Sequence, residues 1–259
     1  MKYIRKAIVL ILAAVFIAAV AIGLSVIFAV RNINVFRIDY QRADGAPSEE
    51  FERALSSVQY SLSEFEGKAI AGVDEEDIAE AVNASGYAEF VSCEKIYPCT
   101  INVTVRERVE IFAVPSEDGL TWSVLDRDCR FISSKRSNAN NLDGSPNVLL
   151  ENIPEEDYQT VAGLAKLFEE KFSSIRAFAE SITMVPAALQ VETDSLCIKL
   201  RCGLTLEIRD YKNSPLEKAE ALCTAFESMP DYLKLSGSMY CMASAGGALR
   251  VVLPDGSVV

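Results

Sequence analysis

Apolar and polar side chains alternate through residues 96–113, IYPCTINVTVRERVEIFA. One row of this stretch contains Ile101, Val103, Val105, Glu107, Val109, Ile111 and Ala113. Successive side chains of a strand point to opposite faces, so the pattern predicts strand structure with one buried face. A charge in a buried row is costly unless it is paired or hydrogen-bonded. We therefore expect Glu107 to have a partner where the strand ends.

In residues 34–97 the spacing of hydrophobic residues changes between the two-residue period of strands and the 3.6-residue period of helices. A strand is predicted at 34–40, a helix at 46–62 capped by Ser48, a second helix at 73–86 capped by Asp74, and a strand at 88–97. Together with the stretch above, the predicted order is strand, helix, helix, strand, strand.

The second half of the chain also mixes helices and strands. Amphipathic helices are predicted at 153–172 and at 214–226, where Ser214 is expected as the cap and Glu217 as its capping-box partner. Between them, residues 195–210 form a hairpin. A three-residue loop at 201–203 sets Leu200 opposite Leu204, and Gly203 supplies the left-handed residue. Strands at 238–243 and 248–253 complete a mixed domain of strands and helices.

The N-terminal part differs from the rest in hydropathy. Residues 7–30 carry no charged side chain and follow Lys2, Arg5 and Lys6. This length predicts a transmembrane helix, and the basic residues predict a cytoplasmic tail at 1–6 and an extracytoplasmic remainder. A cleaved signal peptide is the alternative, but its apolar region would be shorter and followed by a small-residue cleavage site.

Composition excludes several kinds of function. The net charge is −12 and histidine is absent. The acidic balance argues against nucleic-acid binding, and the lack of histidine removes histidine-dependent nucleophile and zinc chemistry. The seven cysteines contain no C-x-x-C pair and are expected to be free thiols. We expect no cofactor, no metal and no small-molecule substrate.

These features together resemble the FtsQ/DivIB family of bitopic cell-division proteins. The motif YP-x-T-I-x-V-x-V-x-E-R carries the resemblance, through Tyr97, Pro98, Thr100, Ile101, Val103, Val105, Glu107 and Arg108. The stretch GLTWSVLDRDCRFIS, with Trp122 and Asp126, is similar to the strand pair that begins the family's second domain. The sequence departs from the family pattern at Val109 and Glu110 and at Cys129, which stands where a glycine is expected.

The resemblance implies an α+β fold and a non-enzymatic role. A POTRA domain is expected at 31–115, with the β-α-α-β-β order, and an FtsQ/DivIB-type β domain at 116–259. The protein would scaffold septal assembly at the cell membrane of the division site through FtsB/DivIC-like and FtsL-like membrane partners. Glu107, Arg108 and Trp122 would mark the domain junction, where Trp122 would pack between the domains.

Partner binding is expected at a strand near the end of the β domain. In the family such a strand accepts a partner strand, and the matching residues here are Leu249, Arg250, Val251 and Val252. Arg250 would offer a cation to an acidic partner, and Val252→Pro is expected to remove a backbone donor from the binding edge. Alternatively, the strand is internal, or residues 254–259 fold back over its edge.

Two other functions are weighed against this one. The first is an extracytoplasmic hydrolase with paired carboxylates, either Asp126 with Asp128 or Glu107 with Glu110. The second is a POTRA-like chaperone or translocation subunit, which would normally contain several such modules, whereas the sequence has one copy. For the motif residues Tyr97 and Pro98, a strand-entry and packing role is favoured over a ligand site.

Overall fold

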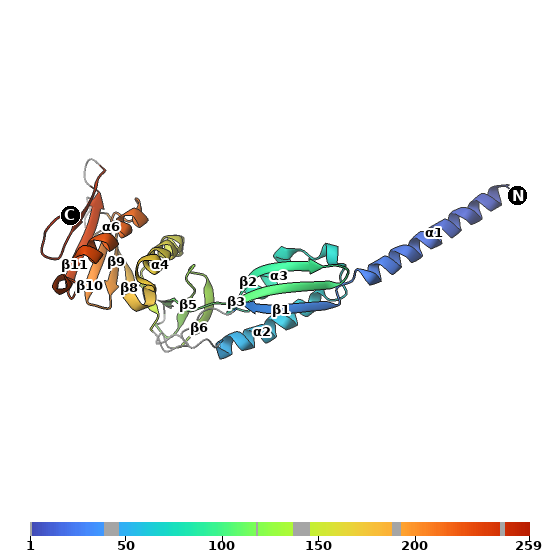
Figure 1. The fold of residues 1–259 in the computed structure, drawn as a ribbon, viewed down its shortest axis with the longest axis horizontal. Coiled ribbons are helices and arrows are strands. Elements are labelled where there is room, and N and C mark those ends of the chain that lie inside the picture. Colours follow the sequence, from blue (N-terminus) through green and yellow to red (C-terminus); the bar gives the residue numbers. More distant parts are fainter. Residues whose placement is uncertain (1, 39–46, 118, 137–145, 188–192, 244–246) are drawn as a thin grey trace. The chain divides into compact units, whose positions relative to one another are not determined.

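The structure is a computed structural model. It describes residues 2–38, 47–117, 119–136, 146–187, 193–243 and 247–259, with the side chains of residues 2–10 left out. The chain divides into two compact units, Met1–Arg108 and Val109–Val259. Each has its own hydrophobic core, and the fold is α+β (Figure 1).

The first unit has the element order expected from the sequence. Its elements are α1 (Lys2–Ile27), β1 (Asn32–Ile38), α2 (Glu49–Leu62), α3 (Glu75–Asn83), β2 (Ala88–Ile96) and β3 (Thr100–Glu107), with short 3₁₀ turns at Ser63–Phe65 and Ile70–Gly72. The sheet order is β1-β3-β2, with β1 parallel and β2 antiparallel to β3. Ile101, Val103 and Val105 form a buried row of β3 against the residues of α2 and α3.

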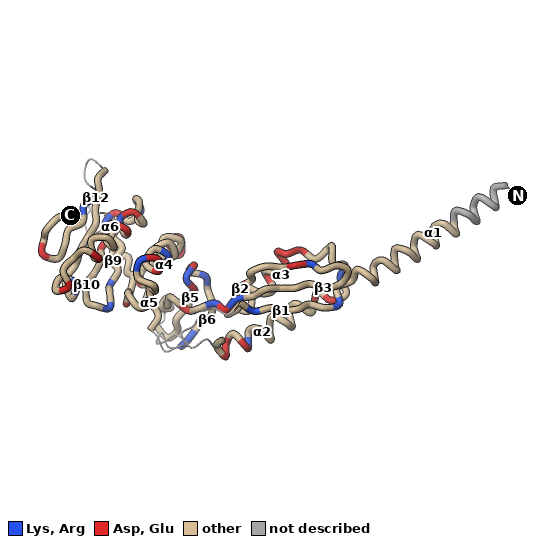
Figure 2. Tube along the Cα trace, in the orientation of Figure 1, with Lys and Arg blue, Asp and Glu red and all other residues tan. Residues whose placement is uncertain are grey.

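The two helices of this core begin differently at their caps. Ser48 caps α2, since its hydroxyl accepts a hydrogen bond from the N–H of Phe51 at 3.1 Å. Asp74 precedes α3 as predicted, but its side chain makes no capping hydrogen bond with described residues. Acidic residues fill the first turns of both helices (Figure 2). Their negative charges are stabilising there, because the N-terminus is the positive end of the helix dipole.

The predicted membrane span is corrected by the structure. Helix α1 ends at Ile27, and residues 28–30 belong to the first unit: Val30 is buried in its core, and Phe28 accepts a hydrogen bond from the N–H of Ile70. A crossing needs about 20 consecutive apolar residues. Within the described residues, whose side chains begin at Ile11, no helix is long and apolar enough to cross a membrane. This contradicts the transmembrane helix at 7–30 and the predicted cell-membrane localisation.

The second unit contains a nine-stranded mixed sheet. Its strands are β4 (Phe112–Pro115), β5 (Trp122–Leu125), β6 (Phe131–Lys135), β7 (Val148–Glu151), β8 (Ala179–Val185), β9 (Ser195–Leu200), β10 (Leu204–Arg209), β11 (Gly237–Ala243) and β12 (Leu249–Val252). The order across the sheet is β12-β11-β10-β9-β8-β7-β4-β5-β6. β4 was predicted from the sequence to belong to the first domain, but it is part of this sheet, and the units divide after Arg108.

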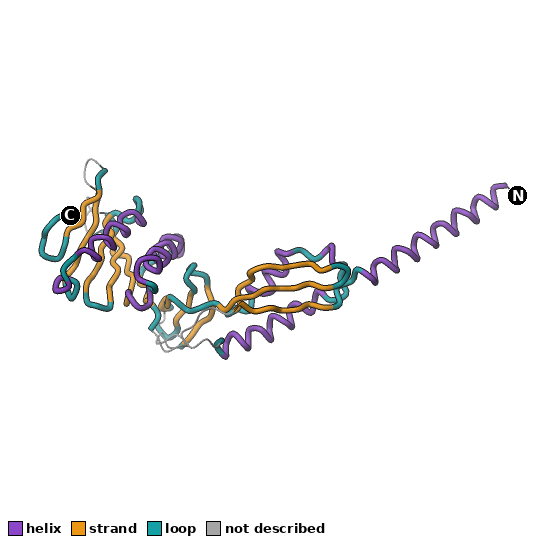
Figure 3. The backbone as a smooth tube through the Cα atoms, viewed as in Figure 1, coloured by secondary structure: helices purple, strands orange, loops and turns teal. Residues whose placement is uncertain are grey.

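Helices cover the core of the second unit. They are α4 (Tyr158–Phe172), α5 (Ile175–Phe178) and α6 (Pro215–Ser228), with 3₁₀ turns at Glu155–Asp157 and Asp231–Leu233. α4 and α6 pack against each other and on the sheet (Figure 3). Pro215 begins α6 as expected, but Ser214 adopts a left-handed conformation and makes no side-chain cap with described residues.

The β9–β10 hairpin has the predicted register. Ile198 pairs with Leu206, and both lie in the core. Gly203 has φ +102° and donates its N–H to the carbonyl oxygen of Leu200. A Cβ atom at this position would lie 2.5 Å from the carbonyl oxygen of Leu235, so the loop needs glycine both for its conformation and for space.

Candidate partner-binding edge

The strand β12 lies at one end of the nine-stranded sheet. It pairs with β11 in antiparallel fashion, Val251 opposite Cys241 and Leu249 opposite Ala243. Val251 is buried in the core, and Leu249 is partly buried against it. Arg250 is exposed and makes no ion pair with the described residues. The four residues predicted to bind a partner therefore lie on an edge strand, in two rows.

The backbone groups of β12 that point away from the sheet belong to alternate residues. Val251 donates its N–H to the carbonyl oxygen of Val259 at 3.1 Å, and Val259 donates its N–H to that of Val251 at 2.9 Å. Because the direction alternates along a strand, Leu249 and Leu253 also point outward, whereas Arg250 and Val252 point toward β11. Val252→Pro would thus disrupt the β11 pairing, which corrects the expectation that it removes an outward donor.

Residues 253–259 turn back along this edge. The N–H of Gly256 bonds to the carbonyl oxygen of Leu253, and the N–H of Leu253 bonds to that of Ser257, each at 2.9 Å. Gly256 has φ +84°, and Asp255 accepts hydrogen bonds from the hydroxyl and N–H of Ser257. These bonds, the hydroxyl first, hold the pKa of Asp255 below its usual value. Residues 257–259, which we call the return segment, thus occupy part of the edge.

The fold-back of residues 254–259, an alternative expected from the sequence, is present, and a turn that had not been predicted forms it. Pro254, Asp255 and Gly256 form a strong turn signal, because proline presets φ, aspartate bonds to the following backbone and glycine adopts positive φ. This signal predicts a reversal directly after β12.

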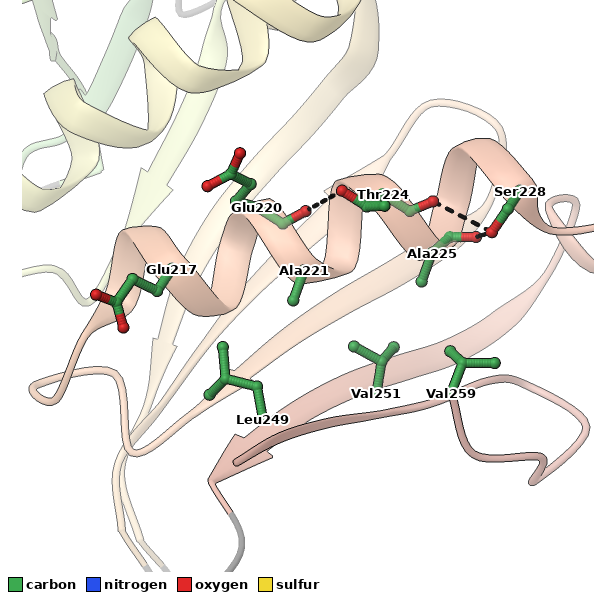
Figure 4. A pocket seen from close by; sticks show the side chains of 9 residues that line it. All are labelled: Glu217, Glu220, Ala221, Thr224, Ala225, Ser228, Leu249, Val251 and Val259. Carbon is green, nitrogen blue, oxygen red and sulfur yellow. Dashed lines mark hydrogen bonds between the residues drawn. The ribbon is translucent and has the colours of Figure 1, made fainter. Parts of the chain in front are cut away.

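A groove of about 620 Å³ lies between α6 and the edge. Figure 4 shows Leu249, Val251 and Val259 in a row facing Ala221 and Ala225 of α6. The small alanine side chains leave room between helix and strand. Glu217 and Glu220 also line the groove, so an apolar centre has acidic groups beside it. This arrangement suits an extended segment that adds to the sheet edge and places apolar side chains against α6.

Glu107 and Arg108 make hydrogen bonds within the first unit. Both are buried, at 5% and 7% exposure. Glu107 ends β3 and accepts a hydrogen bond from the N–H of Ser48 at 3.3 Å. Arg108 donates its side-chain N–H to Asn83 at 3.0 Å and its backbone N–H to Tyr87 at 2.8 Å. The carboxylate in the apolar row therefore lies at the start of α2, where a helix N-terminus favours negative charge.

The carboxylates proposed for hydrolysis are engaged in separate structural contacts. The carboxylate of Asp126 accepts hydrogen bonds from the backbone N–H groups of Asp128 and Arg130, each 2.9 Å long, within its own turn. Asp128 pairs with Lys166 at 2.8 Å, and this hydrogen bond is the main reason that its pKa is lowered. Glu110 pairs with Lys135 at 2.5 Å in the second unit. A carboxyl group with a lowered pKa is poorly suited to act as a general acid.

The remaining motif residues occupy turns and a strand start. Tyr97 and Pro98 lie between β2 and β3, and a cis peptide bond joins the two residues. The exposed ring of Tyr97 packs edge-on against the ring of Phe28, with the two ring centroids 6.3 Å apart. Trp122 begins β5 and is half-buried opposite Pro115 and Lys135. Cys129, which stands where the motif resemblance led us to expect glycine, has φ +57° and lies buried in the core.

The cysteines are free thiols. The seven cysteines are unpaired, and burial raises the pKa of Cys129 and Cys223 to about 12. In the ranges described above, no group of three potential ligands is placed to hold a metal ion. No protein-family model matches the chain, and no curated protein matches it.

Proposed function

We propose that this protein is a non-enzymatic assembly protein of the bacterial division machinery that binds a partner by strand addition at β12. The observation that supports it most is the position of β12 at the end of the sheet, beside an apolar groove. Edge strands present unpaired backbone groups, and main-chain hydrogen bonds then supply affinity while side-chain pockets supply selectivity.

The division assignment comes from the motif resemblance in the sequence. The partners it implies are proteins of the FtsB/DivIC and FtsL type. The chain also has the β-α-α-β-β order in its first unit and a mixed sheet in its second, which agree with the organisation that the resemblance implies. One fold can serve many functions, so the fold alone does not support a role. The proposal that the protein binds a partner strand rests on the β12 edge and its groove, and the proposal that it acts in division rests on the motif.

A non-enzymatic role is favoured by how the acidic side chains are used. Asp126 organises its own turn, and Asp128 is held by Lys166. These contacts give each carboxylate a structural role.

Localisation tests the division role. A fluorescent fusion of the full chain, expressed in dividing cells of its source bacterium, is expected to concentrate at the septum. A uniform distribution throughout the division cycle would contradict the proposal. Free fluorescent protein expressed at the same level is the control.

A further inference from the structure

We infer that residues 257–259 are a resident strand that must leave the β12 edge before a partner strand can bind along its full length. The inference rests on the proposed function, because it concerns the edge that the partner would use. The return segment occupies the outward backbone groups of Val251 and Leu253 through three hydrogen bonds. A partner strand needs the same groups, so both cannot be bound at once.

Few contacts hold the return segment in place. Val258 and Val259 are 59% and 66% exposed, so little apolar area is buried. Besides the three backbone hydrogen bonds, its pairing with β12 is limited to one isolated bridge, between Val252 and Val258. Elements with few buried apolar contacts open locally at low cost. The segment can therefore exchange with a competing strand while the rest of the sheet stays folded.

A partner strand would contact more of the edge than the return segment does. Among the described residues, none bonds to the outward N–H of Leu249. A longer strand would use this group and add side chains to the groove between Leu249 and α6. Side chains opposite Leu249 and Val251 point into the groove, since directly opposed residues lie on the same face of a sheet.

The lining of the groove indicates the chemistry of the incoming strand. Apolar side chains at alternate positions would meet Ala221, Ala225 and Val251, and a lysine or arginine would lie near Glu217 or Glu220. We infer an extended segment that alternates apolar with polar residues and carries a basic residue toward Glu217. Only molecules whose return segment is open can bind the partner strand along the whole edge. The apparent affinity for the partner is therefore the intrinsic affinity multiplied by the fraction of open molecules.

The contrasting interpretation is a permanent cover. Natural sheets protect their edges against unwanted pairing with loops or short strands. A permanent cover would never open for a partner, so locking it would change nothing. The two interpretations differ in what happens when the segment is fixed or loosened.

A disulfide lock fixes the segment. Val252 and Val258 form a non-hydrogen-bonded antiparallel pair, because the hydrogen bonds on either side are made by their neighbours. The Cα atoms of such a pair are about 4.5 Å apart, a separation that a disulfide can span. The variant Val252→Cys/Val258→Cys is locked when oxidised and free when reduced. The single variants, which keep the seven native cysteines, control for other disulfides.

Gly256→Val loosens the segment. Gly256 has φ +84° with open space around its Cα, so valine there strains the turn without a clash. Gly67→Val in the first unit is a matched control, with φ +81° and equally open space. The probe is a fluorescein-labelled peptide of alternating valine and serine with lysine at both ends, and its binding to the full chain is followed by fluorescence anisotropy.

We expect Gly256→Val to bind the peptide roughly tenfold more tightly than the wild type, and the Gly67→Val variant to match the wild type. The oxidised lock should lose binding, and reduction should restore it. Equal binding by the locked, wild-type and Gly256→Val proteins would overturn the inference, as would no binding by any of them. Lock-dependent binding by a protein that does not localise to the septum would keep the inference and reject the division role.

Discussion

The backbone N–H of Ser48 donates a hydrogen bond to Oε1 of Glu107 at 3.3 Å, which joins the start of α2 to the end of β3. Both residues are buried. Ser48 also caps α2 with its hydroxyl, so Glu107 serves the same backbone group that a capping-box glutamate would. The carboxylate comes from a distant strand, and the contact therefore couples the helix to the sheet.

Removing this acceptor should destabilise the first unit. Glu107→Ala leaves a buried N–H without its partner and should cost about 1–3 kcal/mol, whereas Glu107→Gln keeps an acceptor oxygen and should cost less. Thermal unfolding by circular dichroism measures the loss. Trp122, the only tryptophan, lies in the second unit, so its fluorescence transition should not move. Equal stability of the alanine variant and the wild type would show that the contact contributes nothing.

Cys129 has a left-handed conformation that glycine adopts without strain. Cys129→Gly should therefore be more stable than Cys129→Ala, by about 1 kcal/mol, because both lose the thiol but only alanine keeps the strain. Urea unfolding followed by Trp122 fluorescence compares the two variants. An alanine variant as stable as the glycine variant would contradict the role of backbone strain.

Asp157 is a source of acid sensitivity in the second unit. Its carboxylate accepts hydrogen bonds from Tyr211 at 2.6 Å and from Lys212. Burial raises the pKa of Asp157, but the hydrogen bonds from Lys212 and Tyr211 outweigh it, and the net pKa is lowered. A lowered folded-state pKa gives stability that is complete above the unfolded-state pKa of about 3.9 and is lost as the pH falls through the folded-state value.

Asp157→Asn should therefore be less stable than the wild type at pH 7, by about 1–3 kcal/mol. The difference should stay constant down to about pH 5 and shrink as the pH falls below about 4. Urea unfolding at a series of pH values measures it. A difference that does not change between pH 7 and pH 3 would exclude the carboxylate's charge as its cause.

The β9–β10 loop should tolerate no side chain at Gly203. Gly203→Ala combines positive φ with a Cβ only 2.5 Å from a backbone oxygen, and should be destabilised by more than 2 kcal/mol, about twice the effect of strain alone. Gly119→Ala is the matched control, because Gly119 has φ +66° with open space. Urea unfolding of the two variants compares them, and equal losses would show that the Leu235 carbonyl imposes no steric limit.

Local patterns predicted the elements and some of the pairing. Alternation within β9 and β10 fixes which residues face the core, so the pairing of Ile198 with Leu206 follows from sequence. The cap at Ser48 follows from its place before an apolar period. At Ser214 the same signal failed, because a left-handed backbone removed the side chain from its capping position.

Features that depend on distant partners could not be predicted in this way. The outward direction of the Val251 N–H depends on which strand pairs with β12, and no local pattern states that β11 lies on one side and residue 259 on the other. The acceptor role of Glu107 depends on where α2 begins in space. The predicted span failed at its end because Val30 packs into the first unit's core, a contact made by residues far along the chain.

Addition of a partner strand to the β12 edge would use the outward N–H of Leu249. Leu249→Pro removes an outward N–H and leaves the β11 bonds of Arg250 and Val252 intact, while Leu249→Val keeps the donor and an apolar side chain. Circular dichroism checks that both variants fold. The measurement is the amount of FtsB/DivIC-like protein that co-purifies with the full chain from its source cells. If the partner adds at this edge, the valine variant should recover the partner and the proline variant should recover at least tenfold less. Equal recovery by the two folded variants would contradict it.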